Sequence, residues 1–146
     1  MAAFRAVPNS RVRVREFPVA SGETFTSGAI VLMDSGEDIA EVGADPTALL
    51  GIALGAATSG VSTHVDPTKV LVAIAEEGSE FLMSGDNDPV EADINISYGV
   101  VADGDGIWTV DGTETTAEVV HVQDIDLLRN LYIVKFLAAV LQTQGV

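Results

Sequence analysis

Residues 94–112 read INISYGVVADGDGIWTVDG, and this stretch decides the fold class. Residues 94–101 alternate loosely between apolar and polar side chains, and residues 107–110 are rich in β-branched and aromatic side chains. Between them, residues 103–106 form two Asp-Gly pairs, which supply the positive φ that tight turns require. The stretch therefore predicts a hairpin. The aspartates could also suggest a calcium loop, but the glycine and glutamate positions of an EF-hand are missing, so a turn is favoured.

Outward from this hairpin, most of the chain consists of short apolar runs between turn residues, such as residues 29–33, 70–75 and 117–122. Residues 51–57 combine glycine and alanine, which marks close approach to a neighbouring backbone. Asp45 and Pro46 predict one helical turn over residues 45–50. With about eight to ten expected strands, we predict a mainly β fold: a compact barrel- or sandwich-like single domain with at most short helical turns.

The C-terminal stretch DLLRNLYIVKFLAAVLQTQ, residues 126–144, allows two interpretations. Its apolar residues fall at positions 127, 128, 131, 134, 137, 138 and 141, which suits one face of a helix. Its centre, YIVKF, is β-branched and aromatic, which suits a strand. Periodicity alone leaves both open. The apolar run of residues 131–141 is too short to span a membrane as a helix.

Charge is distributed unevenly along the 146 residues, whose formal net charge is −15. Residues 1–15 hold four of the seven basic residues and no acidic residue. Residues 16–146 hold all 22 acidic residues and only Lys69, Arg129 and Lys135, a net charge of −19. A body this negative repels nucleic acid and anionic membranes, so neither is an expected partner. The chain has no cysteine, which excludes disulfides and thiolate chemistry. It also has no recognisable signal peptide.

Four of the seven basic residues lie in a segment that we expect to be an extended N-terminal arm, residues 1–18, ahead of a β-rich body, residues 19–146. Pro8 and Pro18 disfavour helix, and residues 11–15, RVRVR, alternate with the period of a strand. The arm could bind nucleic acid, be a loose end, or dock on another protein by adding a strand to an acidic surface; docking is favoured. The candidate contact residues are Phe4, Arg5, Arg11, Val12, Arg13, Val14, Arg15 and Phe17.

No catalytic, cofactor or metal site is predicted. His64 and His121 are the only histidines, neither has ligand spacing, and there is no nucleophile elbow to complete a serine triad. The glycine-rich stretch lacks the lysine of a phosphate loop. Asp86, Asp88 and Glu91 are interpreted as a surface loop. Trp108 is interpreted as a core or subunit-interface residue rather than a sugar platform, and the candidate oligomer interface comprises Trp108, Tyr132 and Phe136.

The order of segments resembles that of the small decoration, or cement, proteins of tailed-bacteriophage capsids. An arm leads to VASGETFTSGAIVLMDSGEDIAEVGADPTALLGIALGAA (residues 19–57), then VLVAIAEEGSEFLM (70–83), ADINISYGVVADGDGIWTVD (92–111) and VVHVQDIDLLRNLYIVKFLAAVLQ (119–142). The resemblance implies that residues 131–137 form a strand and that the protein is a homo-oligomer, commonly a trimer. It also implies an arm that crosses onto the major capsid protein and a location on the outer surface of the virion.

Three functions are weighed. The favoured one is a non-enzymatic structural protein that decorates and stabilises the capsid. A second is a receptor- or surface-binding β module of a phage or cell surface. The low aromatic content argues against sugar as the ligand of such a module. A third is a small trimeric nucleotide hydrolase of the dUTPase type, whose C-terminal Gly-rich, Arg-bearing segment is missing from LQTQGV at the end of this chain.

Overall fold

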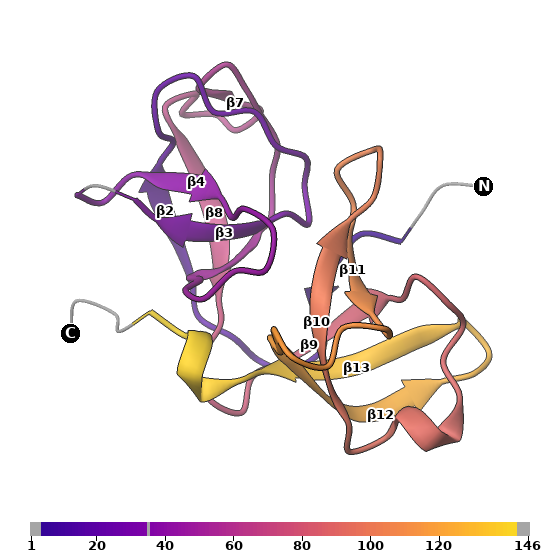
Figure 1. The fold of residues 1–146 in the computed structure, drawn as a ribbon. Coiled ribbons are helices and arrows are strands. Elements are labelled where there is room, and N and C mark those ends of the chain that lie inside the picture. The colour runs from indigo at the N-terminus through magenta and orange to yellow at the C-terminus, as the bar shows by residue number, and fades with distance from the viewer. Residues whose placement is uncertain (1–3, 35, 143–146) are drawn as a thin grey trace.

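The computed structural model describes residues 4–34 and 36–142, and its described residues form two main antiparallel sheets (Figure 1). The first sheet has the order β2 (Val14–Pro18), β8 (Lys69–Ile74), β5 (Gly51–Ala53), β3 (Ile30–Met33) and β4 (Ile39–Glu41). The second has the order β1 (Val7–Pro8), β9 (Glu80–Ser84), β13 (Leu131–Phe136), β12 (Val120–Asp126), β10 (Ser97–Ala102) and β11 (Trp108–Asp111). Strands β6 (Ala57–Thr58) and β7 (Val61–Ser62) form a small hairpin.

The two sheets share one apolar core, which makes the chain a single domain. The core cluster draws buried side chains from both sheets, including Ile30 and Ile74 from the first and Phe81 and Phe136 from the second. The C-terminal end joins the sheets, because the Leu49 N–H donates to the carbonyl of Val140 at 2.8 Å. The prediction of a mainly β single domain is confirmed.

The predicted hairpin over residues 94–112 is confirmed as β10 and β11. These strands pair from Gly99 with Asp111 to Ala102 with Trp108. The Asp103 carboxylate closes the turn by accepting hydrogen bonds from the N–H groups of Asp105 (2.8 Å) and Ile107 (3.0 Å). Asp103 therefore serves the turn, as its position between two strands predicts.

The predicted helical turn over residues 45–50 is wrong. Asp45 adopts a positive φ of 49°, which is outside the helical region. Leu49 and Leu50 are fully buried, and the Leu50 N–H donates to the carbonyl of Val31 at 2.8 Å. Burial and hydrogen bonds to distant strands outweigh the local Asp-Pro signal. The described helical turns are two single 3₁₀ turns elsewhere, η1 (Glu91–Asp93) and η2 (Ala138–Val140).

The C-terminal stretch resolves as a strand, as the resemblance implied. In β13, Tyr132, Val134 and Phe136 are buried, whereas Ile133 and Lys135 between them are half-buried. Positions 143–146 lie outside the described residues. Over the two described ranges there is no helix with the length and apolar character needed to cross a bilayer.

The small residues of β5 permit close strand packing, as the composition predicted. A Cβ atom on Gly51 would lie 2.0 Å from the Ala73 carbonyl oxygen on the neighbouring strand β8. Any larger residue would push β5 away from β8 and open the first sheet. Glycine at position 51 is therefore required by packing rather than by a special backbone angle.

Candidate functional site

The N-terminal segment of residues 4–18 is extended and lies along both sheets. Strand β1 pairs with β9 of the second sheet, and the Asn9 N–H continues that contact by donating to the Glu80 carbonyl at 2.8 Å. Strand β2 then pairs with β8 of the first sheet. Ala6 and Phe17, both buried, anchor the segment at its two ends. Strands β1 and β2 of this segment thus already belong to the two sheets, with residues 9–13 linking them, and the division of the chain at residue 18 stays a prediction.

Strand β2 lies at the edge of the first sheet and has one unpaired side. The Ile74 N–H of β8 donates to the Arg13 carbonyl at 2.8 Å. Because the hydrogen-bonding side alternates along an antiparallel strand, the odd-numbered residues of β2 point their backbone groups at β8 and the even-numbered ones point theirs away from it. The N–H groups of Val14 and Glu16 consequently point outward. Within the described residues, no strand pairs with residues 14–17 on this side. The open stretch ends at Val19, which forms a parallel bridge with Ile39 of β4. Such an edge is a template for a strand from another chain.

The arginines of this segment lie exposed beside that edge. The Arg13 Nε forms an ion pair with Glu76 Oε1 at 3.1 Å, which uses one of the five N–H donors of the guanidinium. The Arg15 guanidinium lies over the Phe17 ring, 5.2 Å from its centroid. Arg11 is exposed. The three side chains form a positive surface on an otherwise acidic molecule, and exposed ion pairs of this kind contribute little to stability.

The remaining predicted contact residues of the segment divide between the surface and the body. Phe4 is half-buried, and Arg5 is exposed and donates from its guanidinium to the Ser27 carbonyl at 3.3 Å. Val12 packs against the core, whereas Val14 is 46% exposed. The buried Phe17 contributes to this chain's own core, so its side chain is not on the surface. The exposed members, Arg5, Arg11, Arg13, Val14 and Arg15, are the ones available to a partner.

The structure corrects the candidate oligomer interface. Trp108, Tyr132 and Phe136 are only 3%, 2% and 1% exposed, so they are core residues of a single chain and offer no surface to a second copy. The Trp108 Nε1 donates to Glu41 Oε2 at 2.8 Å, which ties β11 to β4 across the two sheets. Phe136 packs edge-on against Phe81, with ring centroids 5.3 Å apart.

A carboxylate–tyrosine cluster was missed by the sequence interpretation. Asp93 of η1 accepts hydrogen bonds from the hydroxyls of Tyr98 (2.7 Å) and Tyr132 (3.0 Å) and from the N–H of Val90 (3.0 Å). Partial burial raises the pKa of Asp93, but these hydrogen bonds outweigh burial and hold that pKa below its usual value. Burial and the Asp93 charge raise the pKa of Tyr98 to about 12. The tyrosines thus remain protonated donors, and the cluster ties η1 to β10 and β13. No sequence signal marks it, because the three residues meet only through the sheet.

His121 lies beside a serine, but the part of the chain that the structure describes does not complete a triad around it. The Ser97 hydroxyl and His121 Nδ1 share a hydrogen bond of 3.0 Å between paired positions of β10 and β12. A serine nucleophile also needs a group that orients the histidine and donors for an oxyanion. Within residues 4–34 and 36–142, no carboxylate is hydrogen-bonded to His121. Nor do the described residues contain a group of three or more His, Asp or Glu side chains that could hold a metal ion.

A hollow of about 320 Å³ lies between the sheets at the β10–β11 hairpin. Its walls include Val42, Val100 and Trp108, and it also carries the carboxylates of Glu41 and Asp111. Acidic walls disfavour phosphate groups. This hollow is therefore a poor site for the nucleotide substrates of a dUTPase-type enzyme.

Comparison with known proteins provides no family assignment, because no family model and no curated protein matches the chain. The function is accordingly argued from the geometry and charge of the surface. The β2 edge and its arginines are the candidate functional site.

Proposed function

We propose that this chain is a non-enzymatic structural protein that decorates and stabilises the capsid of a tailed bacteriophage, bound on the outer surface to assembled major capsid protein. The observation that carries the proposal is the unpaired side of β2 with exposed Arg11, Arg13 and Arg15 beside it. The order of sequence segments, which resembles that of capsid decoration proteins, directs the proposal to a capsid partner.

The edge and the arginines would act in different ways. A strand of the capsid subunit would bond to the outward backbone groups of Val14 and Glu16, which provides affinity without a specific side-chain motif. The guanidinium groups of Arg11, Arg13 and Arg15 would face carboxylates or carbonyl groups of the subunit. The remainder of the chain, with its net charge of −19, would be repelled by acidic surfaces and so orient the basic edge toward them.

We further propose that the protein binds as a homo-oligomer, with a trimer as the expected state. Several edges held together raise the effective concentration of each at the shell, so a weak single contact becomes a stable one. The self-contact would have to use residues other than the buried Trp108, Tyr132 and Phe136.

The test of the proposal is co-sedimentation with purified, expanded empty shells of a tailed phage that encodes this chain. Binding of wild-type protein and loss of binding in the Arg11→Glu/Arg13→Glu/Arg15→Glu variant are expected. Lys69→Glu/Lys135→Glu, which also adds negative charge but lies outside the segment, is the charge control and should pellet better than the arginine variant. Absence of wild-type protein from the pellet contradicts the proposal.

A second variant isolates the backbone contribution. Glu16→Pro removes an outward N–H and leaves the pairing with β8 intact, because proline is tolerated on the open side of an edge strand. Glu16→Ala keeps the N–H and is the matched control. Loss of shell binding in the first variant only is expected, and equal binding by both rules out strand addition at this edge.

A further inference from the structure

The turn between β12 and β13 exposes two adjacent leucines. Leu127 is 57% and Leu128 is 98% exposed, at the end of the hairpin that lies farthest from the first sheet (Figure 1). Single exposed leucines are ordinary in soluble proteins. Here, however, Leu127 and Leu128 continue into the half-buried side chains of Ile94, Ile125 and Ile133, and together they line an open hollow of about 590 Å³. The hollow therefore combines a small apolar surface with acidic side chains, and two adjacent exposed leucines offer that surface to a partner.

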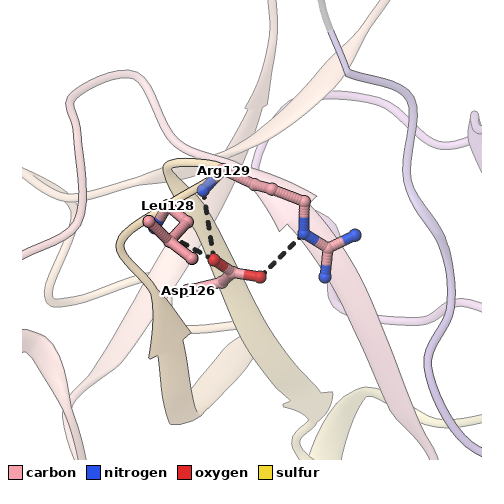
Figure 2. Close-up of polar contacts among 3 residues, drawn as sticks. All are labelled: Asp126, Leu128 and Arg129. Atoms are coloured by element: carbon pink, nitrogen blue, oxygen red, sulfur yellow. Dashed lines mark hydrogen bonds and ion pairs between the residues drawn. The ribbon is translucent and has the colours of Figure 1, made fainter.

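The turn is held in one conformation with the leucines outward. One oxygen of the Asp126 carboxylate accepts hydrogen bonds from the N–H groups of Leu128 and Arg129, each at 3.1 Å (Figure 2). Its other oxygen accepts from Arg129 Nε at 2.7 Å. Asn130 completes the turn with a positive φ of 57°. A turn fixed in advance loses little conformational entropy when a partner covers it.

The charges around the hollow indicate which partner fits. Among its described lining residues are the carboxylates of Glu91, Asp124 and Asp126 and no lysine or arginine. Asp126 is paired with Arg129, which leaves Glu91 and Asp124 as acceptors at the rim of an apolar floor. The rim repels acidic peptides, nucleic acid and anionic lipid, and it attracts lysine or arginine.

We infer that this hollow, the leucine hollow, is a second docking surface, and that it binds a protein segment with apolar side chains beside lysine or arginine. The apolar side chains pack on Leu127, Leu128, Ile125 and Ile133, and the cations face Glu91 and Asp124. The surface is distinct from the β2 edge in position, charge and mode of recognition. It goes beyond the capsid proposal and does not depend on it, since it concerns another sheet and the opposite sign of charge.

The experiment titrates the ¹⁵N-labelled full chain at low salt with two peptides, acetyl-SLRLRLS-amide and acetyl-SLELELS-amide. They carry the same leucines and opposite charges. The arginine peptide is expected to shift the amides of Leu127, Leu128, Ile125 and Ile133 in a saturable way, and more weakly as salt is added. The glutamate peptide is expected to leave them unchanged. No shift with the arginine peptide, equal shifts with both peptides, or shifts elsewhere on the molecule would overturn the inference.

Variants separate the apolar and charged contributions. Leu127→Ser/Leu128→Ser is expected to lower the affinity for the arginine peptide by at least about tenfold, because it removes the apolar contact. Glu91→Gln/Asp124→Asn should weaken binding of the arginine peptide by about threefold to tenfold and reduce its salt dependence. Val65→Ser, at an equally exposed but separate valine, is the control and should bind as wild type. Unchanged binding in the leucine variant overturns the inference.

The same variants distinguish a partner from a second copy of this chain. Light scattering of the wild type and of Leu127→Ser/Leu128→Ser is expected to give the same mass in solution. A smaller mass for the variant alone would mean that the leucines are covered by another copy, and the assignment to a basic partner segment would fail. Neither result bears on co-sedimentation through the β2 edge.

Discussion

The β2 edge and the β12–β13 turn are both exposed, yet they present opposite features. Strand β2 has unpaired backbone groups, Arg15 within it and Arg11 and Arg13 just before it are exposed, and its apolar Phe17 is buried. The β12–β13 turn joins two strands that pair with each other, apart from a bulge between Val122 and Asp124, and it exposes Leu127 and Leu128 beside acidic side chains. The first surface is suited to backbone recognition and the second to side-chain packing. Sign of charge and backbone pairing, rather than exposure alone, therefore distinguish the two.

The largest expected effect is at the anchor of the β2 edge. Phe17→Ala removes a buried aromatic side chain, so the free energy of unfolding should fall by about 3–5 kcal/mol. Strand β2 should detach from β8 before the second sheet is affected. Urea unfolding and amide exchange at Ile74 measure both effects. A loss below about 1 kcal/mol would contradict the assignment of Phe17 to the core.

A smaller loss of stability is expected at the cluster of Asp93, Tyr98 and Tyr132. Asp93→Ala removes the acceptor of the Tyr98 and Tyr132 hydroxyls, so a decrease of about 2–3 kcal/mol is expected. Tyr98→Phe/Tyr132→Phe removes the two hydroxyl donors, so no buried hydroxyl is left without an acceptor. Its free energy of unfolding should therefore fall by less than that of Asp93→Ala. If the double phenylalanine variant loses more stability than Asp93→Ala, hydrogen bonds to Asp93 are not what ties η1 to β10 and β13.

Acid should disorder the β12–β13 turn before it affects the β2 edge. The Arg129 side chain, with the N–H groups of Arg129 and Leu128, holds the pKa of Asp126 below its usual value. Since the pKa in the folded state is lowered, the turn is fully ordered above the ordinary carboxyl pKa of about 4. Its order is lost as the pH falls through the lower pKa of the folded state.

Amide exchange of Leu128 and Arg129 measures this transition. The Ile74 amide is the internal reference, because it donates to a backbone carbonyl that does not titrate. Asp126→Asn should remove the pH dependence at the turn. Identical pH profiles for the turn and the reference amide would show that the Asp126 carboxylate does not hold the turn.

The smallest expected effect is at the leucines themselves. Leu128→Ala should change the free energy of unfolding by less than about 0.5 kcal/mol, because the side chain is 98% exposed. Urea unfolding gives the value. Leu131→Ala, at the buried first residue of β13, is the matched contrast, with an expected loss of about 2–5 kcal/mol. A large loss in Leu128→Ala would indicate a packing role and remove the basis for the leucine hollow.

The β10–β11 hairpin was predictable because its determinants are local. Asp-Gly pairs select the turn, and Asp103 makes its hydrogen bonds within four residues of itself. The close packing at Gly51 was predictable for the same reason, since small residues in a strand have few other uses. The helical turn at residues 45–50 failed because Leu49 and Leu50 bond to Val140 and Val31, which lie far away in sequence.

The candidate site was only partly predictable. The concentration of Arg11, Arg13 and Arg15 is a property of the sequence, and so is their separation from the acidic residues. That Val12 packs on the core while Val14 is exposed depends on where pairing with β8 begins. The exposure of Leu127 and Leu128 was concealed by their fit to a helical period, which would have placed them on one face with residue 131.

The sequence by itself determined a β-rich single domain, the β10–β11 hairpin and the charge separation, because turn chemistry, strand propensity and charge act over a few residues. The tertiary structure alone decided that Trp108, Tyr132 and Phe136 form the core, that β2 has an open side, and that two leucines project from a fixed turn. Each of these depends on which strands become neighbours. Strand pairing joins residues up to 75 positions apart, as Val7 with Leu82 illustrates, and no local pattern encodes it.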